Sequence, residues 1–276
     1  MTDYIMGRIE SIFNSVSSAG TGNLILSPES FNQSIYNGII LIMRNAVMPV
    51  AYVLLSLFLL LELYNYTIRM ESAHGISGLE YPAKIMLKIV LCKIVIDNTE
   101  LILNAIFGMS SQLIVNINGI ITGGNVLSPA DLEAMRQTVE SMNFGEQLMN
   151  GVIVTIIFIV VKFVMLIVSV IVVGRMIEIY IKMALSPLPM ATFPNSEASN
   201  VGKNYLKDFI AVCLQGVIIY LVITIFPLLF GNATMGDINV SQDFTDGLFT
   251  AVGYSFVLLI SVFASGKWAK SLCNAM

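Results

Sequence analysis

The main pattern along the chain is a series of long apolar runs separated by short polar segments. A helix needs about 20 apolar residues to cross the hydrocarbon layer of a bilayer, which is about 30 Å thick. The pattern predicts an all-α fold, a polytopic membrane helical bundle with about five transmembrane helices. The regions that reach or approach the required length are about 46–63, a stretch within 85–121, 151–174, 209–230 and 248–265.

Two polar segments carry helix-start signals. Ser27-Pro28 and Ser128-Pro129 each place a hydroxyl at the capping position and a proline at the first helical position, where its missing N–H costs nothing. We expect short amphipathic helices there, on or near the outer surface. The predicted organisation is an outside N-terminal amphipathic segment, 1–45, and a membrane helical domain, 46–276, with an outer helical loop at 122–150.

Composition agrees with lipid as the surrounding solvent. Of the 276 residues, 56% are hydrophobic and 12% are charged, whereas a soluble domain carries about 25% charged residues. The net charge of -4 excludes the bulk basic character of a soluble nucleic-acid-binding domain. The first twenty residues contain Asp3 and Glu10 and no continuous apolar run, so we do not expect a cleavable signal peptide.

Lysines and arginines beside the predicted spans indicate the orientation, because short loops rich in them stay cytoplasmic. The loop between the fourth and fifth spans has neither, and it carries Asp237, Asp243 and Asp246, so it is predicted outside. The tail after the fifth span carries Lys267 and Lys270 and is predicted inside. Alternation across the spans then puts the N-terminus outside and the C-terminus in the cytoplasm.

The sequence lacks the motifs that indicate an enzyme. The single histidine, His74, lies in a predicted loop without the partners that a catalytic or metal site needs. The cysteines are far apart and form neither a disulfide framework nor a metal-ligand spacing. The segment 201–204 contains Gly-Lys but lacks the other residues of a nucleotide-binding loop. We predict no catalytic residue, no metal, no cofactor and no enzymatic activity.

Polar residues inside the second span form a stripe. At about 100° per residue, one side of this helix carries Lys93, Asp97, Glu100, Asn104, Ser111 and Asn118. Ionisable groups are costly in lipid, so the stripe either lines a water-filled path or a subunit interface, or is satisfied within the bundle. In the second case Lys93 pairs with Asp97, and the asparagines bond to neighbouring helices. Because the region is longer than one crossing, it forms either one helix or two pieces.

Lys162 lies near the middle of the third predicted span. The centre of the hydrocarbon layer is about 15 Å from either interface, which is too far for a lysine side chain to reach water. We therefore expect this side chain to face protein, water or a bilayer defect. Two interpretations stay open: an ion pair with a buried carboxylate such as Asp97 or Glu100, or a position that lines a pore.

Basic residues follow the third span. Arg175, Glu178 and Lys182 recur at helical spacing and predict an exposed ladder that anchors the inner end of the helix. The helix is expected to continue until Pro187 stops it. Positive-inside topology explains the basic residues of the inner loops, and contact with DNA phosphates is the alternative. The candidate cytoplasmic contact residues are Arg175, Lys182, Lys203, Lys207, Lys267 and Lys270.

The segment from Gly174 to Tyr220 resembles the TrbL-like family. An apolar helix with a basic end is followed by Ser186-Pro187-Leu188, a polar loop, Gly202-Lys203 and a second apolar helix. Members of this family are polytopic inner-membrane components of conjugative type IV secretion systems. The resemblance is to the forms found on integrative conjugative elements of Gram-positive bacteria.

The resemblance implies a channel or scaffold subunit of a conjugative DNA transfer machine in the bacterial plasma (inner) membrane. The implied partners are further copies of the chain in a five-fold homo-oligomeric ring, other secretion-system subunits including ATPases, transferred single-stranded DNA, and membrane phospholipids. The alternative function is a secondary transporter or ion channel for a small solute, in which Asp97, Glu100 and Lys162 would be the coupling or selectivity groups.

Overall fold

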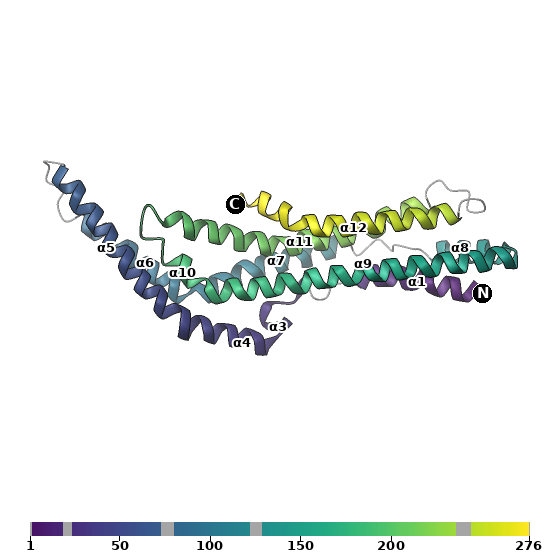
Figure 1. The fold of residues 1–276 in the computed structure, drawn as a ribbon, viewed down its shortest axis with the longest axis horizontal. Coiled ribbons are helices and arrows are strands. Elements are labelled where there is room, and N and C mark those ends of the chain that lie inside the picture. Colours follow the sequence, from purple (N-terminus) through teal and green to yellow (C-terminus); the bar gives the residue numbers. More distant parts are fainter. Residues whose placement is uncertain (1, 19–23, 73–79, 122–128, 236–243, 276) are drawn as a thin grey trace. The chain divides into compact units, whose positions relative to one another are not determined.

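The computed structural model describes residues 2–18, 24–72, 80–121, 129–235 and 244–275, and the regular structure in these ranges is helical. The elements are shown in Figure 1. They are α1 (Thr2–Ser18), α3 (Pro28–Phe31), α4 (Gln33–Ile42), the π-helix η1 (Met43–Val47), α5 (Met48–Ser72), α6 (Glu80–Asp97), α7 (Thr99–Ile121), α8 (Pro129–Ser141), α9 (Phe144–Leu185), α10 (Pro187–Met190), α11 (Ser199–Met235) and α12 (Phe244–Leu272).

The helices form two compact units. Unit 1 consists of Met1–Ile25, Ser111–Gly174 and Gln215–Trp268, and unit 2 consists of Leu26–Ser110, Arg175–Leu214 and Ala269–Met276. Four long helices, α7, α9, α11 and α12, therefore contribute residues to both units.

In unit 1, the amphipathic helix α1 lies beside α9 (Figure 1). It buries Ile5 and Ile9, and its Tyr4 hydroxyl is 3.0 Å from the Thr155 hydroxyl of α9. An ion pair of 3.0 Å between Asp3 and Arg136 joins α1 to α8. Burial of one apolar face thus fixes this helix on its neighbours, as expected for an amphipathic segment.

In unit 2, helices α5 and α6 pack side by side (Figure 1). One core cluster joins α4, α7, α9 and α11, and it includes the fully buried Met176 and Phe209. A second cluster joins α5 and α6 to the short helix α10, whose Met190 is fully buried. The connection between α9 and α11 is therefore part of the packed interior of this unit.

The expected number of membrane spans is confirmed: in the described part of the chain, five helical stretches are long and apolar enough to cross a bilayer. Each overlaps one of the predicted regions. They are Gln33–Ile68, Thr99–Ile120, Phe144–Leu185, Ser199–Ile225 and Val252–Leu272.

The first stretch begins earlier than the apolar run alone indicates. Ser27 caps α3 as predicted, accepting from the Ser30 N–H at 3.1 Å, but that helix ends after one turn. Asn32 then caps α4, and η1 links α4 to α5 without a break. The predicted boundary at residue 45 falls inside η1, and the separate outside segment stays a prediction.

The second predicted region consists of two pieces, α6 and α7, separated at Asn98. The Asn98 side chain donates to the Ile94 carbonyl at 2.8 Å, and the Thr99 hydroxyl donates to the carbonyls of Val95 and Ile96 at 2.9 Å. Such bonds compete with the helical ladder. Of the two pieces, α7 provides the candidate span.

The third span continues as one helix to Leu185 and ends directly before Ser186-Pro187, as predicted. The helix predicted after Pro129 is present as α8, and its position on the outer side stays a prediction. Its predicted cap, Ser128, lies outside the described residues, as do His74, Asp237 and Asp243.

Candidate functional site

Three residues of the polar stripe meet side chains of α4, η1 and α5 in unit 2. Glu100 accepts from Arg44 at 2.6 Å and from the Tyr36 hydroxyl at 3.2 Å. Asn104 donates to the same Tyr36 hydroxyl at 2.7 Å. Asp97 accepts from the Tyr52 hydroxyl. These hydrogen bonds therefore tie the end of α6 and the start of α7 to α4, η1 and α5.

Two further stripe residues have partners in unit 1. The Ser111 hydroxyl donates to the Ile25 carbonyl at 2.6 Å, and the Asn118 amide oxygen accepts from the Tyr220 hydroxyl of α11 at 2.7 Å. Lys93 is exposed, and among the described ion pairs none joins it to Asp97. These contacts support the interpretation in which the stripe is satisfied within the bundle, and a role in lining a pore or a subunit interface stays a prediction.

Lys162 is exposed on α9. Its ammonium lies 5.4 Å from the centre of the Phe158 ring, in unit 1. The two carboxylates proposed as its partners, Asp97 and Glu100, belong to unit 2 and are engaged there by Tyr52, Tyr36 and Arg44. The ion pair of Lys162 with either of them stays a prediction.

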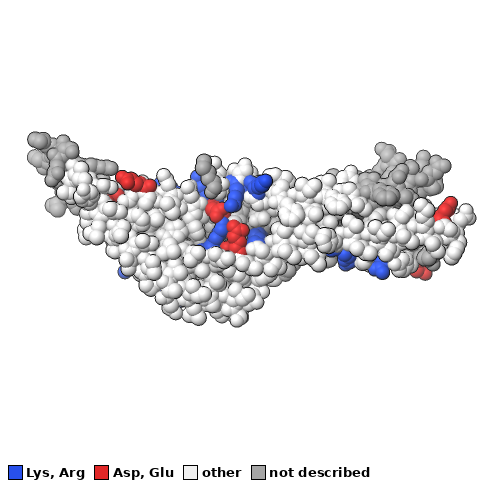
Figure 2. All heavy atoms as spheres, viewed as in Figure 1, with Lys and Arg blue, Asp and Glu red and all other residues white. Residues whose placement is uncertain are grey.

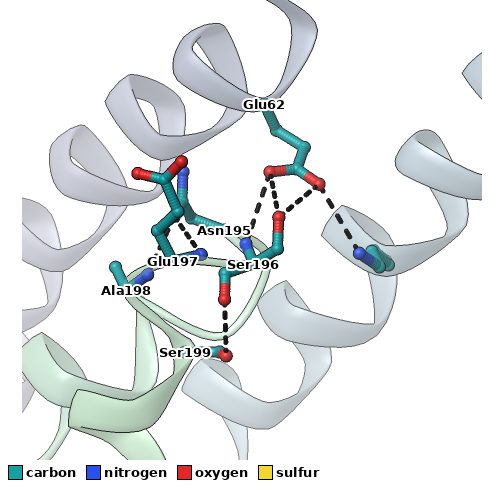
Figure 3. Close-up of polar contacts among 7 residues, drawn as sticks. Glu62, Asn195, Ser196, Glu197, Ala198 and Ser199 are labelled. Carbon is teal, nitrogen blue, oxygen red and sulfur yellow. Dashed lines mark hydrogen bonds and ion pairs between the residues drawn. The ribbon is translucent and has the colours of Figure 1, made fainter. Parts of the chain in front are cut away.

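The connector from Ser186 to Ala198, between α9 and α11, is held by a buried acid. Glu62 of α5 is only 5% exposed, and its carboxylate accepts from the Ser196 backbone N–H at 3.3 Å and from the Ser196 hydroxyl at 3.1 Å (Figure 3). Lys88 of α6 lies 3.6 Å away. Glu62 of α5 thus holds one point of the connector, and α6 contributes the lysine that pairs with this acid.

The connector is also ordered by its own side chains. The Asn195 side-chain oxygen accepts from the N–H groups of Glu197 and Ala198, each at 2.9 Å, which caps the approach to α11. The Thr192 hydroxyl accepts from the Gly202 N–H at 3.1 Å. The segment is therefore a defined turn and not a loose loop.

Gly202 fits tightly against this connector. A Cβ at this position would lie 2.7 Å from the Pro189 carbonyl oxygen and 3.1 Å from the Phe193 ring. Gly202 belongs to the pattern that resembles the TrbL-like family, so close packing is a physical reason for a glycine at that point. By contrast, Glu62 was not among the predicted site residues, although an acid within the apolar run of α5 was a signal for it.

The predicted exposed ladder is wrong at Arg175. This side chain is 3% exposed, its guanidinium lies 5.9 Å from the centre of the Phe107 ring, and its Nε and Nη1 have no hydrogen-bond partner in the described part of the chain. Helical spacing placed it in line with Glu178 and Lys182, but α7 packs against this part of α9 and covers it. A buried guanidinium without an acceptor is energetically unfavourable.

Further along α9, Lys182 belongs to a charged cluster. It contacts Asp208 of α11 and Glu178 at 3.1 Å, and Lys270 of α12 lies 3.4 Å from the other Asp208 oxygen. Figure 2 shows charged side chains of both signs gathered in one patch of a largely uncharged face.

The remaining basic candidates differ in how far they reach solvent. Lys203 and Lys267 are exposed, and Lys207 is half-buried. A contact of these residues with DNA or another subunit stays a prediction.

No group of three potential ligands that could hold a metal ion occurs among the described residues. The buried thiols Cys92 and Cys213 are free. The polar clusters consist of carboxylates paired with lysine, arginine, tyrosine or serine, an arrangement that binds helices together.

Comparison with known proteins identifies the family. A family model described as TrbL/VirB6 plasmid conjugal transfer like protein matches residues 13–187, more than half of the 276-residue chain. The match extends to Pro187, so it reaches only the first part of the segment whose pattern resembles the TrbL-like family. The comparisons with curated proteins and with solved structures gave no match. The chain therefore belongs to the TrbL/VirB6 family of conjugal transfer proteins and is a multi-pass membrane component of conjugal transfer.

Proposed function

We propose that this chain is a channel or scaffold subunit of a conjugative type IV secretion machine, and that several copies assemble in the bacterial inner membrane. The family match over residues 13–187 carries this proposal. The subunit has no enzymatic role in it, and separate ATPases supply the energy for transfer. Transferred single-stranded DNA and other secretion-system subunits are the proposed partners.

An apolar stripe on α9 supports assembly of several copies. Large apolar side chains at spacings of three and four residues are all substantially exposed: Val152, Ile156, Ile159, Phe163, Leu166, Val170 and Val173. This spacing puts them on one side of the helix and is that of the contact seam between two packed helices. Lipid or a second copy must cover such a face, and the proposal assigns it to a second copy.

The proposed orientation keeps the N-terminus outside and puts the connector, Ser186–Ala198, in the cytoplasm. In a background without native cysteines, Glu197→Cys should react with a membrane-impermeant maleimide only after lysis. Ser241→Cys, at a position outside the described residues, should react in intact cells. The opposite pattern would show that the orientation is inverted.

The test of assembly uses one pair of neighbouring positions on α9. Phe163 is exposed and Val164 is buried, so a cysteine at 163 should form a disulfide-linked dimer on mild oxidation in membranes, and one at 164 should not. In parallel, deletion of the gene should abolish conjugal transfer, and the wild-type chain should restore it.

Two results would contradict the proposal. Conjugal transfer at the normal frequency in the deletion strain would show that the chain is not needed for transfer, and it would favour the function of a small-solute transporter. Equal and low cross-linking at 163 and 164, together with quenching of a fluorophore at 163 by lipid-soluble quenchers, would show that the stripe faces lipid.

A further inference from the structure

Two cationic side chains from separate helices lie on one aromatic ring. The Arg8 guanidinium of α1 is 4.5 Å from the centre of the Phe158 ring, and the Lys162 ammonium of α9 is 5.4 Å from the same centre. Arg8 also lies 5.2 Å from the centre of the Tyr4 ring. The ring faces attract both cations, so the packing of α1 on α9 brings two positive charges together.

No acid neutralises this pair within the described part of the chain. The acid at the start of α1, Asp3, is engaged by Arg136 at 3.0 Å, and no ion pair joins Arg8 or Lys162 to a carboxylate there. Both charges lie within 5.4 Å of the centre of one ring, so an anion that reaches this part of α9 is attracted by both. Lys162 is exposed, so an anion can reach the pair from outside the protein.

The position of α1 indicates how deep in the bilayer Arg8 and Lys162 lie. This helix buries Ile5, Ile9 and Ile12 against its neighbours while Asp3 and Glu10 are exposed, and it is not one of the candidate spans. A short amphipathic helix of this kind lies at the level of the lipid headgroups. Because Arg8 and Tyr4 contact Phe158 and Thr155, that part of α9 lies at the same level.

The length of α9 agrees with this depth. At about 1.5 Å per residue, its 42 residues extend over about 63 Å, twice the thickness of the hydrocarbon layer. About 20 residues are needed to cross, and Lys162 and Lys182 are separated by that interval. With the span between them, both lysines reach a headgroup region, and neither is left at the bilayer centre.

We propose that Arg8 and Lys162 together bind the phosphate of an anionic phospholipid. The guanidinium can donate two parallel N–H bonds to phosphate oxygens, and the ammonium adds a compact second charge. The site explains the mid-helix lysine without an internal carboxylate, and it does not depend on the proposed role in transfer.

The experiment is native mass spectrometry of the full chain in detergent, titrated with phosphatidylglycerol or with zwitterionic phosphatidylcholine. The wild type should retain one phosphatidylglycerol in preference to phosphatidylcholine. Each cation near an anionic lipid contributes about fivefold in affinity, so Arg8→Gln with Lys162→Gln should weaken retention by about 25-fold. The matched control, Lys84→Gln with Lys203→Gln, removes two exposed lysines and should leave retention unchanged.

A charge-conserving variant separates binding from folding: Arg8→Lys with Lys162→Arg should retain the lipid. The proposal is overturned if the glutamine variant binds phosphatidylglycerol as tightly as the wild type does, or if both lipids bind equally. It is also overturned if inorganic phosphate displaces the lipid, which would indicate a site for the free anion. Displacement by an oligothymidylate would indicate a nucleic-acid site and would overturn it as well.

Discussion

The carboxylate of Glu62 accepts hydrogen bonds from both the backbone and the hydroxyl of Ser196, across a sequence separation of 134 residues. Glu62 is buried, and removal of its carboxylate takes away the acceptor that the protein provides for Ser196. A single side chain of α5 therefore holds the connector between two candidate spans.

Replacement of Glu62 by leucine should destabilise the protein by about 1 kcal/mol, the usual net contribution of a hydrogen bond, because Ser196 loses its acceptor. Thermal unfolding of the detergent-solubilised protein measures this, and faster proteolysis should appear between Ser186 and Ala198. Glu197→Leu is the control, because that acid is exposed. Equal unfolding temperatures for the two variants would show that the Glu62 contacts do not hold the connector.

Substitution of Gly202 by alanine should also destabilise the protein, by about 2 kcal/mol, because the new Cβ meets the Pro189 carbonyl at 2.7 Å. Gly174→Ala provides the comparison: nothing lies within 4 Å of its Cβ position, and alanine favours a helix by up to about 1 kcal/mol. The two variants should shift the unfolding temperature in opposite directions. If the Gly202→Ala protein is as stable as the Gly174→Ala protein, the connector shifts to make room for the new Cβ without loss of stability.

Arg175→Met should leave stability unchanged or raise it by about 1 kcal/mol, because the buried guanidinium has unsatisfied N–H groups and an apolar side chain of similar length has none. Arg44→Met should lower stability, by up to about 1 kcal/mol, since it breaks the contact with Glu100. Unfolding temperatures measured side by side test both. A larger loss for Arg175→Met than for Arg44→Met would reveal an anionic group bound to Arg175.

Asn104→Leu combined with Ser111→Leu should weaken helix packing inside each chain, because both side chains bond to other segments of the same chain, at Tyr36 and Ile25. We expect a loss of about 1 kcal/mol for each bond and normal insertion. Ile106→Leu with Ile120→Leu is the control of similar volume. If stability is unchanged while conjugal transfer falls, the stripe lines an aqueous path instead.

The sequence predicted the features that depend on local composition. Apolar length located the candidate spans, and Pro187 located the end of α9. Burial depends on which face of a helix meets a neighbour, and spacing alone does not determine it. Arg175 is in line with Lys182 on α9, yet α7 covers the first and leaves the second to meet Asp208.

The partner of Glu62 could not be predicted for a similar reason. An acid in an apolar run indicates that a partner exists, but Ser196 becomes its neighbour only when α5, α6 and the connector pack together. The length of this region leaves one helix or two pieces open, and the position of the break at Asn98 does not follow from the sequence, because asparagine is compatible with either a continuous helix or a bond back to its own backbone.

The π-helix η1 carries a consequence for the register of the first candidate span. A π-helical turn contains an additional residue compared with an α-helical turn, so α4 and α5 are out of angular phase by about 100°. Tyr36 faces Glu100 and Asn104 in the register that Met43–Val47 sets by holding that extra residue. Deleting one residue there would restore a regular helix, rotate α4 about its axis and carry the Tyr36 hydroxyl away from both partners. The extra residue of η1 thus sets the rotation of α4 about its axis relative to α5, within one continuous helical stretch.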